Sequence, residues 1–310
     1  MTKTVLFFPG QASQYVGMAK DLYEYSPAVR EMYDLAADEM KADIAKLSFE
    51  GPAEELKRTR FTQPAILLHS LAVLRLLGEA LPSFDYAAGH SLGEYGALAV
   101  AGAFTFEDAV RAVVKRAALM EEACVQNPGT MAATMGLTPE QVQDVCDRAS
   151  EVGVVVPANF NSTGQIVISG EIAAVEKAAE LAKAAGAKRA IRLEVGGAFH
   201  SPLMAPARDG LEEFLKGVDI KDPRLPVVAN VTGEAVSKAE DVRRLLVEQI
   251  TSPVRWAQTM EYLNRQGVKR IFEIGPGKVL TGLAKREMQP EESITLDTLA
   301  DVKQFAPVEA

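Results

Sequence analysis

Short apolar runs alternate with longer helical patterns toward both ends of this 310-residue chain, and no other feature restricts its fold more. Such alternation is typical of a parallel sheet whose strands are joined by helices. The residues predict strands over Thr4–Phe8, Phe84–Ala88 and Val268–Ile274, and helices over Gln63–Leu77, Leu92–Ala101 and Phe106–Cys124. We therefore expect an α/β core domain built on a largely parallel sheet.

The middle of the chain has a different order of elements. It predicts strands over Thr130–Met135, Val154–Asn159, Gln165–Ser169 and Arg189–Val195, with helices over Pro139–Ala149 and Ile172–Ala185. The order β-α-β-β-α-β is that of a ferredoxin-like unit. We therefore predict a ferredoxin-like subdomain over residues 127–197, inserted into a core domain formed by residues 1–126 and 198–310. A cleft between them is the expected substrate site. Residues 297–310 are expected to form a loosely held tail.

Charge and composition exclude several classes of function. With 33 basic and 42 acidic residues the net charge is −9, which argues against nucleic acid as the main partner. Uncharged stretches fall short of the ~20 apolar residues that span a bilayer, and the N-terminus does not resemble a signal peptide. Two cysteines and three histidines show no disulfide framework and no zinc spacing. We expect a soluble, cytoplasmic protein in two parts, of the size of an enzyme.

The motif Gly89-His90-Ser91-Leu92-Gly93 matches G-x-S-x-G and lies between a predicted strand and a predicted helix. That context is the one a nucleophile elbow requires, because the turn exposes the serine hydroxyl at a helix N-terminus. Flanking glycines lack the Cβ atoms that would clash in so tight a turn. The alternative is a glycine-rich turn with a capping serine. In this context the motif favours Ser91 as a nucleophile.

A serine nucleophile needs a base, and the chain offers three histidines. His69 lies inside an apolar helix, where a packed core histidine is expected. His90 directly precedes Ser91, and neighbours on an extended segment point to opposite faces. Elimination leaves His200, in a flexible, glycine-rich loop just after the last subdomain strand, although a histidine there could also be simply solvated.

Arg116 stands out on the helix predicted over Phe106–Cys124. On a helical wheel it falls at the edge of the apolar arc, between Ala109 and Met120, whereas Lys115 falls on the opposite side. An arginine in that position either extends past the core into solvent or is a buried cation that awaits an anion. The wheel leaves both interpretations open.

Five motifs along the chain together resemble the malonyl-CoA:acyl carrier protein transacylases of type II fatty acid synthesis. These are Phe8–Gln14, Gly89–Glu94, Gly197–Ser201, Ser252–Trp256 and Glu273–Gly277, in the family's order. The resemblance covers nearly the whole chain. It implies a hydrolase-like α/β domain that carries a ferredoxin-like subdomain, the same fold class that the elements predict.

The resemblance also implies a role for each matching residue. The residues and roles are Ser91 as nucleophile, His200 as base, Arg116 as ligand of the malonyl carboxylate, the N–H groups of Gln11 and Leu92 as oxyanion hole, the main-chain carbonyl of Gln249 as the group that orients the histidine, and His90 and Asn159 as support. It implies no metal and no bound cofactor. Malonyl-CoA and acyl carrier protein are the implied partners of a monomeric enzyme. For docking an acidic carrier protein, Lys188, Arg189 and Arg192, or Lys285 and Arg286, are candidates.

The implied reaction is ping-pong acyl transfer through an acylated Ser91. Four alternatives remain at the level of the sequence. They are a serine thioesterase, the malonyl transferase of a polyketide synthase, that of a malonate decarboxylase system, and an idle scaffold that binds acyl carriers. A thioesterase would have a side-chain acid to orient the histidine and water as the acceptor.

Overall fold

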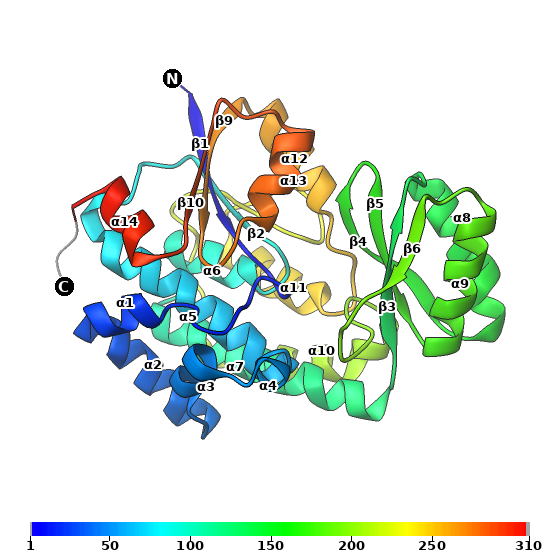
Figure 1. Ribbon diagram of the computed structural model, residues 1–310, viewed down its shortest axis with the longest axis horizontal. Helices are drawn as coiled ribbons and strands as arrows, with labels where there is room; N and C mark the ends of the chain where they lie inside the picture. The colour runs from blue at the N-terminus through cyan, green and yellow to red at the C-terminus, as the bar shows by residue number, and fades with distance from the viewer. Residues whose placement is uncertain (1, 308–310) are drawn as a thin grey trace.

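A six-stranded sheet forms the centre of the larger part of the molecule in this computed structural model, which describes residues 2–307 (Figure 1). In spatial order its strands are β10 (Glu292–Leu296), β9 (Val268–Ile274), β1 (Lys3–Phe8), β2 (Tyr86–Gly89), β7 (Val227–Val228) and β8 (Ala235–Val236). Neighbouring strands are parallel except β7 and β8, which are antiparallel. The predicted, largely parallel core sheet is confirmed, and the structure adds three strands that the sequence did not predict: β10, β7 and the short antiparallel edge strand β8.

Helices cover both faces of this sheet, so its central strands are apolar on both sides. On β1, Leu6 and Phe8 pack into the core under α5 (Thr59–Leu77), α6 (Gly93–Val100) and α7 (Phe106–Gln126). Val5 and Phe7 pack on the other face under α12 (Trp256–Arg265) and α13 (Val279–Glu287), where the ring of Phe7 meets Trp256 edge-on at 5.0 Å. The outer helices of the large part are α1 (Lys20–Tyr25), α2 (Pro27–Met40), α3 (Ile44–Glu50), α4 (Ala53–Leu56), α10 (Ala205–Lys216), α11 (Ala239–Gln249) and α14 (Leu299–Phe305).

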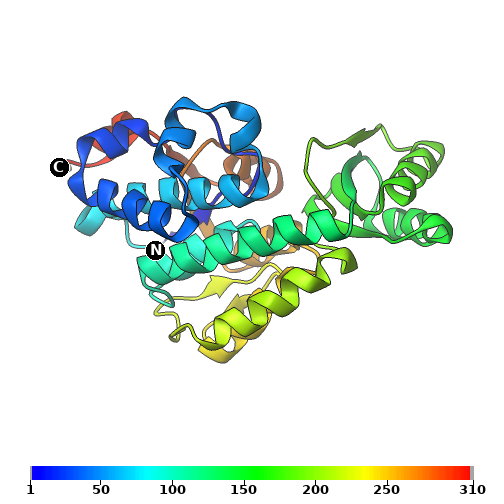
Figure 2. The same cartoon turned by 90° about the horizontal axis from the view of Figure 1, so that it is seen from below.

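A separate antiparallel sheet forms the smaller part of the molecule. Its order is β4 (Val155–Ser162), β5 (Gln165–Gly170), β3 (Thr130–Met135) and β6 (Arg189–Arg192), with α8 (Pro139–Ala149) and α9 (Ile172–Ala184) on one face. This is the predicted β-α-β-β-α-β order, although β6 ends at Arg192 instead of Val195. The long helix α7 leads from the core to this sheet (Figure 2). The domain limits at residues 127 and 197 stay a prediction.

The C-terminal segment is not the loosely held tail that its composition suggests. Leu299–Phe305 forms α14, whose first turn has a capping box between Thr298 and Asp301. Val302 is buried, and the ring of Phe305 packs edge-on against Phe272 of β9 at 5.4 Å. Two apolar side chains at helical spacing and a cap are enough to hold this segment on the core. Residues 308–310 of the expected tail lie outside the described residues.

One helical segment of the described residues, Thr59–Ala80, is long and apolar enough to cross a membrane. It comprises α5 and the 3-10 turn that follows. The protein's own elements bury 83% of its most apolar stretch, so these side chains are used in the core of the large part.

Candidate active site

Ser91 lies on a strained turn between β2 and α6. Its backbone φ is +52°, in the left-handed region that non-glycine residues seldom adopt. The turn needs glycine on both sides. A Cβ on Gly89 would lie 2.0 Å from the main-chain oxygen of Gly93, and one on Gly93 would lie 2.2 Å from that of Phe8. The G-x-S-x-G motif therefore forms the elbow that its context predicts, with the serine hydroxyl exposed to a pocket.

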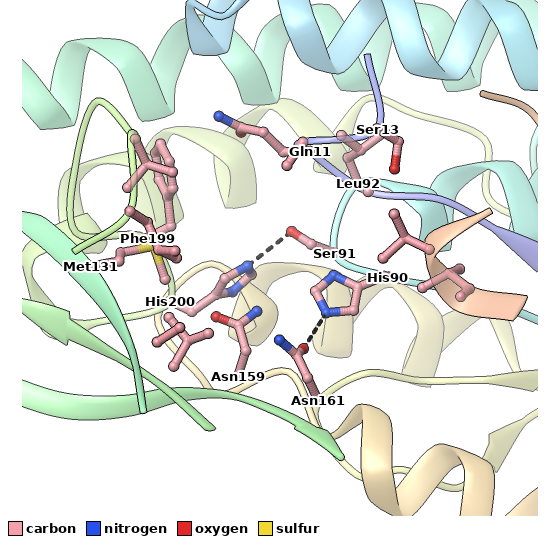
Figure 3. Close-up of a pocket in the computed structure, with 18 of the residues that line it drawn as sticks. Gln11, Ser13, His90, Ser91, Leu92, Met131, Asn159, Asn161, Phe199 and His200 are labelled. Carbon is pink, nitrogen blue, oxygen red and sulfur yellow. Dashed lines mark hydrogen bonds between the residues drawn. The ribbon is translucent and has the colours of Figure 1, made fainter. Parts of the chain in front are cut away.

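Ser91, His200 and Gln249 form a hydrogen-bonded chain. The Oγ atom of Ser91 is 2.9 Å from Nε2 of His200, as the dashed line in Figure 3 marks, and Nδ1 of His200 is 2.9 Å from the main-chain oxygen of Gln249. Because a carbonyl oxygen only accepts, Nδ1 carries the proton and Nε2 is free to accept from the serine hydroxyl. The group that orients the histidine is thus a main-chain carbonyl and not a carboxylate.

His200 is buried, with 3% of its surface exposed, and not held in a flexible, solvated loop as its glycine-rich surroundings predict. The turn after it is pinned, since Ser201 Oγ donates to the Ala198 oxygen at 2.6 Å. Burial and the nearby Arg116 cation lower the pKa of His200 to about 3. The imidazole is therefore neutral at physiological pH and able to accept a proton.

Arg116 is the buried cation of the two interpretations that the wheel allows, with 1% of its surface exposed. Its Nη2 donates to Ser91 Oγ and to Gln249 Oε1, each at 2.9 Å, and its Nη1 donates to Gln63 Oε1 at 2.5 Å. All three acceptors are neutral, and Nε has no partner within residues 2–307. A buried guanidinium held only by neutral groups is suited to bind an incoming carboxylate.

The pocket around Ser91 has a volume of about 330 Å³ and is lined by both parts of the molecule. Gln11 and Leu92 border it from the core, and neither main-chain N–H has an acceptor within the described residues. Figure 3 shows both on the same side of Ser91. Their placement fits the oxyanion hole that the resemblance implies, because free N–H groups beside a nucleophile can stabilise a developing negative charge.

His90 and Asn159 border the same pocket. His90 does not contact the hydroxyl of Ser91. Its Nε2 lies 2.9 Å from Oδ1 of Asn161 on β4, and thus links the elbow to the smaller sheet (Figure 3). His69 is the packed core histidine that its helix predicts, fully buried with Nε2 2.6 Å from the main-chain oxygen of Asp297.

Sequence reasoning missed four residues that contact this site: Gln63, Glu94, Asn161 and Asn230. Asn230 accepts the Ser91 N–H at 2.6 Å and donates to the Gly89 oxygen at 2.7 Å, and so holds the elbow from both sides. Gln63 lies in the apolar run of α5. A polar residue in such a run is expected to be buried and to need a hydrogen-bond partner, and this signal could have pointed to the site. Asn161 and Asn230 lie in segments whose sequence carries no such signal.

The candidate docking cations lie at two separate places, on α13 and at β6. Arg286 lines the pocket and is exposed together with Lys285 on α13. Arg189 and Arg192 are exposed on β6, the edge strand of the smaller sheet. Within residues 2–307 no group of three or more His, Cys, Asp or Glu side chains is arranged to hold a metal ion.

Comparisons with known proteins agree with this fold. A model of the acyl transferase domain matches residues 5–303. The malonyl CoA-acyl carrier protein transacylase of Bacillus subtilis is 48% identical over 287 residues, which cover 92% of this chain and 90% of that protein. The Escherichia coli K12 protein of the same name is 45% identical over 289 residues, with 92% and 93% covered.

Two solved structures are similar to this chain over nearly its whole length. A malonyl CoA-acyl carrier protein transacylase from Coxiella burnetii has a TM-score of 0.92 and 41% identity, covering 98% of this chain and 96% of that one. A malonyl-transacylase in complex with the holo acyl carrier protein of a type II polyketide synthase has a TM-score of 0.92 and 42% identity, with 98% and 99% covered.

The chain has an α/β core, a serine on an elbow and a histidine oriented by a main-chain carbonyl, and the acyl transferase domain model matches it. These features define its class as the acyl transferases. The chain belongs to this family and, by its full-length relatives, to the malonyl CoA-acyl carrier protein transacylases within it.

Proposed function

We propose that this protein transfers the malonyl group from malonyl-CoA to the phosphopantetheine thiol of an acyl carrier protein, in fatty acid biosynthesis. One observation carries the proposal. Ser91 Oγ contacts both Nε2 of His200 and Nη2 of Arg116, each at 2.9 Å. A nucleophile, its base and a cation for the second carboxylate of malonate thus lie within reach of one thioester.

In the first half-reaction Ser91 Oγ attacks the thioester carbonyl carbon while its proton passes to Nε2 of His200. The negative charge that develops on the carbonyl oxygen is stabilised by the N–H groups of Gln11 and Leu92. The C–S bond then breaks, and CoA leaves as a thiol with the proton from His200. The product is malonyl-Ser91, and atoms and charge balance without an external oxidant or metal.

In the second half-reaction the carrier-protein thiol enters the vacated pocket and gives its proton to Nε2 of His200. The thiolate attacks the ester carbonyl, the C–O bond breaks, and Ser91 recovers its proton from the imidazolium. The thioester supplies the activated acyl group, so we propose that no cofactor takes part. Arg116 holds the free carboxylate of the malonyl group in both steps.

The serine thioesterase alternative differs in the group that orients the histidine. A thioesterase would have a side-chain acid there, whereas the main-chain oxygen of Gln249 holds Nδ1 of His200. Incubation with malonyl-CoA and holo acyl carrier protein tests the proposal. We expect malonyl carrier protein to accumulate with little free malonate, and release of malonate at an equal rate without carrier protein would contradict it.

The pathway, the assembly and the location are finer parts of the proposal. The relative bound to a polyketide carrier protein favours a second candidate role in polyketide synthesis, since the same chemistry serves both pathways. Competition between a fatty acid and a polyketide carrier protein for malonyl transfer separates the two roles.

We propose a monomer that acts in the cytoplasm with no nucleic-acid or membrane partner. The net charge of −9 supports the absence of a nucleic-acid partner. Light scattering tests the monomer, and cell fractionation tests the location.

A further inference from the structure

Glu94 is a buried carboxylate for which the transfer mechanism above has no use. It lies in the first turn of α6, three residues after Ser91, and 3% of its surface is exposed. One of its oxygens, Oε2, accepts two hydrogen bonds, from the Asn230 N–H at 3.0 Å and from Nε2 of Gln249 at 2.8 Å. Buried carboxylates are costly unless such donors hold them, so this arrangement constrains both donors.

The bond from Gln249 fixes which way its side-chain amide points. Nε2 donates to Glu94 Oε2 and to the Ser91 main-chain oxygen at 3.1 Å, and both partners accept only. The amide oxygen is thereby left to face Arg116, and it accepts a hydrogen bond from Nη2 of that residue at 2.9 Å. The reversed amide would set its oxygen against two acceptors and its NH₂ group against the guanidinium.

Arg116 depends on this orientation because it has few other partners. The two hydrogens of Nη2 go to Gln249 Oε1 and Ser91 Oγ, and Nη1 donates to Gln63 Oε1. A guanidinium is planar, so two acceptors on one nitrogen and a third on the next set the plane in which it meets a carboxylate. Turning the Gln249 amide would remove one of these acceptors and place a donor beside the cation.

We propose that Glu94 is a positioning residue for substrate selection, which fixes the Gln249 amide and through it the plane of Arg116 that receives the malonyl carboxylate. This inference rests on the proposed function. It concerns the acceptor oxygen of Glu94 and not its charge. Burial raises the pKa of this carboxyl to about 7, so its neutral form is populated near neutral pH.

Three variants separate the acceptor from the charge. Glu94→Gln keeps an acceptor oxygen at the same reach and removes the charge, whereas Glu94→Asp keeps the charge and withdraws the acceptor by one C–C bond, ~1.5 Å. Glu94→Ala removes both. The readout is the ratio of kcat/KM for malonyl-CoA to that for acetyl-CoA, with the melting temperature measured alongside. We expect a ratio near wild type for Glu94→Gln and a fall of about tenfold for Glu94→Asp and Glu94→Ala, equivalent to ~1.4 kcal/mol of coupling.

A double-mutant cycle with Arg116→Ala tests whether Glu94 acts through Arg116. In the Arg116→Ala background we expect Glu94→Asp to leave the malonyl-to-acetyl ratio unchanged. An unchanged ratio in Glu94→Asp alone, or a fall in Glu94→Gln equal to that in Glu94→Asp, would overturn the inference. If Glu94→Ala fails to fold, the Asp and Gln pair decides. A wild-type protein that moves no malonyl group would instead overturn the proposed function.

Discussion

The charge of the guanidinium sets the chemistry of this site at the scale of single residues. Arg116 is buried among neutral hydrogen-bond acceptors, and burial together with this nearby cation lowers the pKa of His200. In the proposed reaction one positive charge therefore has two effects: it attracts a carboxylate-bearing substrate, and it adds to the burial that keeps His200 unprotonated. Each effect can be measured separately.

Removal of the cation should abolish the preference for a second carboxylate. Truncation of one partner of a desolvated charge pair costs ~2–5 kcal/mol, so Arg116→Ala should lower malonyl transfer by roughly 30-fold to several thousand-fold. Reaction with acetyl-CoA should persist or increase, because acetyl has no charge to be buried unpaired. The measurement is kcat/KM for both thioesters on wild type and variant. Equal losses on the two substrates would mean that Arg116 is merely structural.

The pH dependence of acylation reports on His200. Its active form is the neutral one, which persists at every pH above its lowered pKa of about 3. The rate of malonyl-enzyme formation should therefore stay flat from pH 8 down to about pH 5, with no inflection near the ordinary histidine value of ~6.5. Stopped-flow detection of CoA release measures the rate of malonyl-enzyme formation at each pH. A rate that falls at low pH with a midpoint near ~6.5 in wild type, and does not do so in His200→Gln, would contradict this expectation.

Truncation of the histidine itself provides the matched test. His200→Ala should slow acylation by roughly 10²–10⁴-fold, the usual loss for a positioned general base. His90→Ala is the control, because His90 contacts Asn161 instead of the Ser91 hydroxyl. A near-normal rate in His200→Ala together with a large loss in His90→Ala would reverse the two assignments.

Residues were predictable from the sequence where local pattern decides their position. The glycines around Ser91 specify a turn, and elimination among three histidines indicates His200. The burial of Arg116 was not predictable, because a helical wheel shows the edge of an arc and not what covers it. The partners Glu94 and Asn230 depend on contacts between residues 136 positions apart, which no local pattern encodes.

The elbow between β2 and α6 is the element that places the nucleophile. Its glycines are required by close backbone approach, since a Cβ on Gly93 would lie 2.2 Å from the Phe8 oxygen of the neighbouring strand. β1 and α6 can pack this closely only because no side chain lies between them. The elbow is thus part of the core as much as of the site.

Gly93→Ala should therefore destabilise the protein and inactivate it together. Overpacking of this kind typically costs ~1–3 kcal/mol, and main-chain oxygens move less readily than side chains. Gly282 on α13 is the control, because a Cβ there meets nothing within 4 Å, and alanine favours a helix by about 1 kcal/mol over glycine. We expect chemical denaturation to show a loss for Gly93→Ala and no loss for Gly282→Ala. Equal stability of the two variants would contradict the packing argument.

Elements with a strong internal period were predictable, and those that depend on tertiary contacts were not. β9 and β3 have the predicted bounds because their apolar runs are short and end at turns. α14 was missed because its few apolar residues are stabilised by packing on distant elements, as Phe305 packs on Phe272 of β9. β6 ends at Arg192. The Leu193 N–H still donates to the Met131 oxygen of β3, and Leu193 and Val195 line the pocket.

The whole molecule is two sheets with the reacting serine at their junction. β4 of the smaller sheet is tied to the core through the Phe160 N–H to the Val254 oxygen at 2.8 Å, and through Asn161 to His90. Both parts therefore line one pocket, which in the proposed reaction takes malonyl-CoA first and the carrier-protein thiol second. One residue of this pocket, Ser91, carries the malonyl group between these two events in the proposed reaction.

Intact-mass spectrometry of the protein detects such a malonyl-enzyme. Wild type mixed with malonyl-CoA should gain the mass of one malonyl group, located on Ser91 by peptide mapping, and should lose it when holo acyl carrier protein is added. Ser91→Ala should gain no mass, because no other hydroxyl lies on such an elbow within the described residues. A malonyl adduct on another residue of Ser91→Ala, or loading of the carrier protein by that variant at the wild-type rate, would contradict the account.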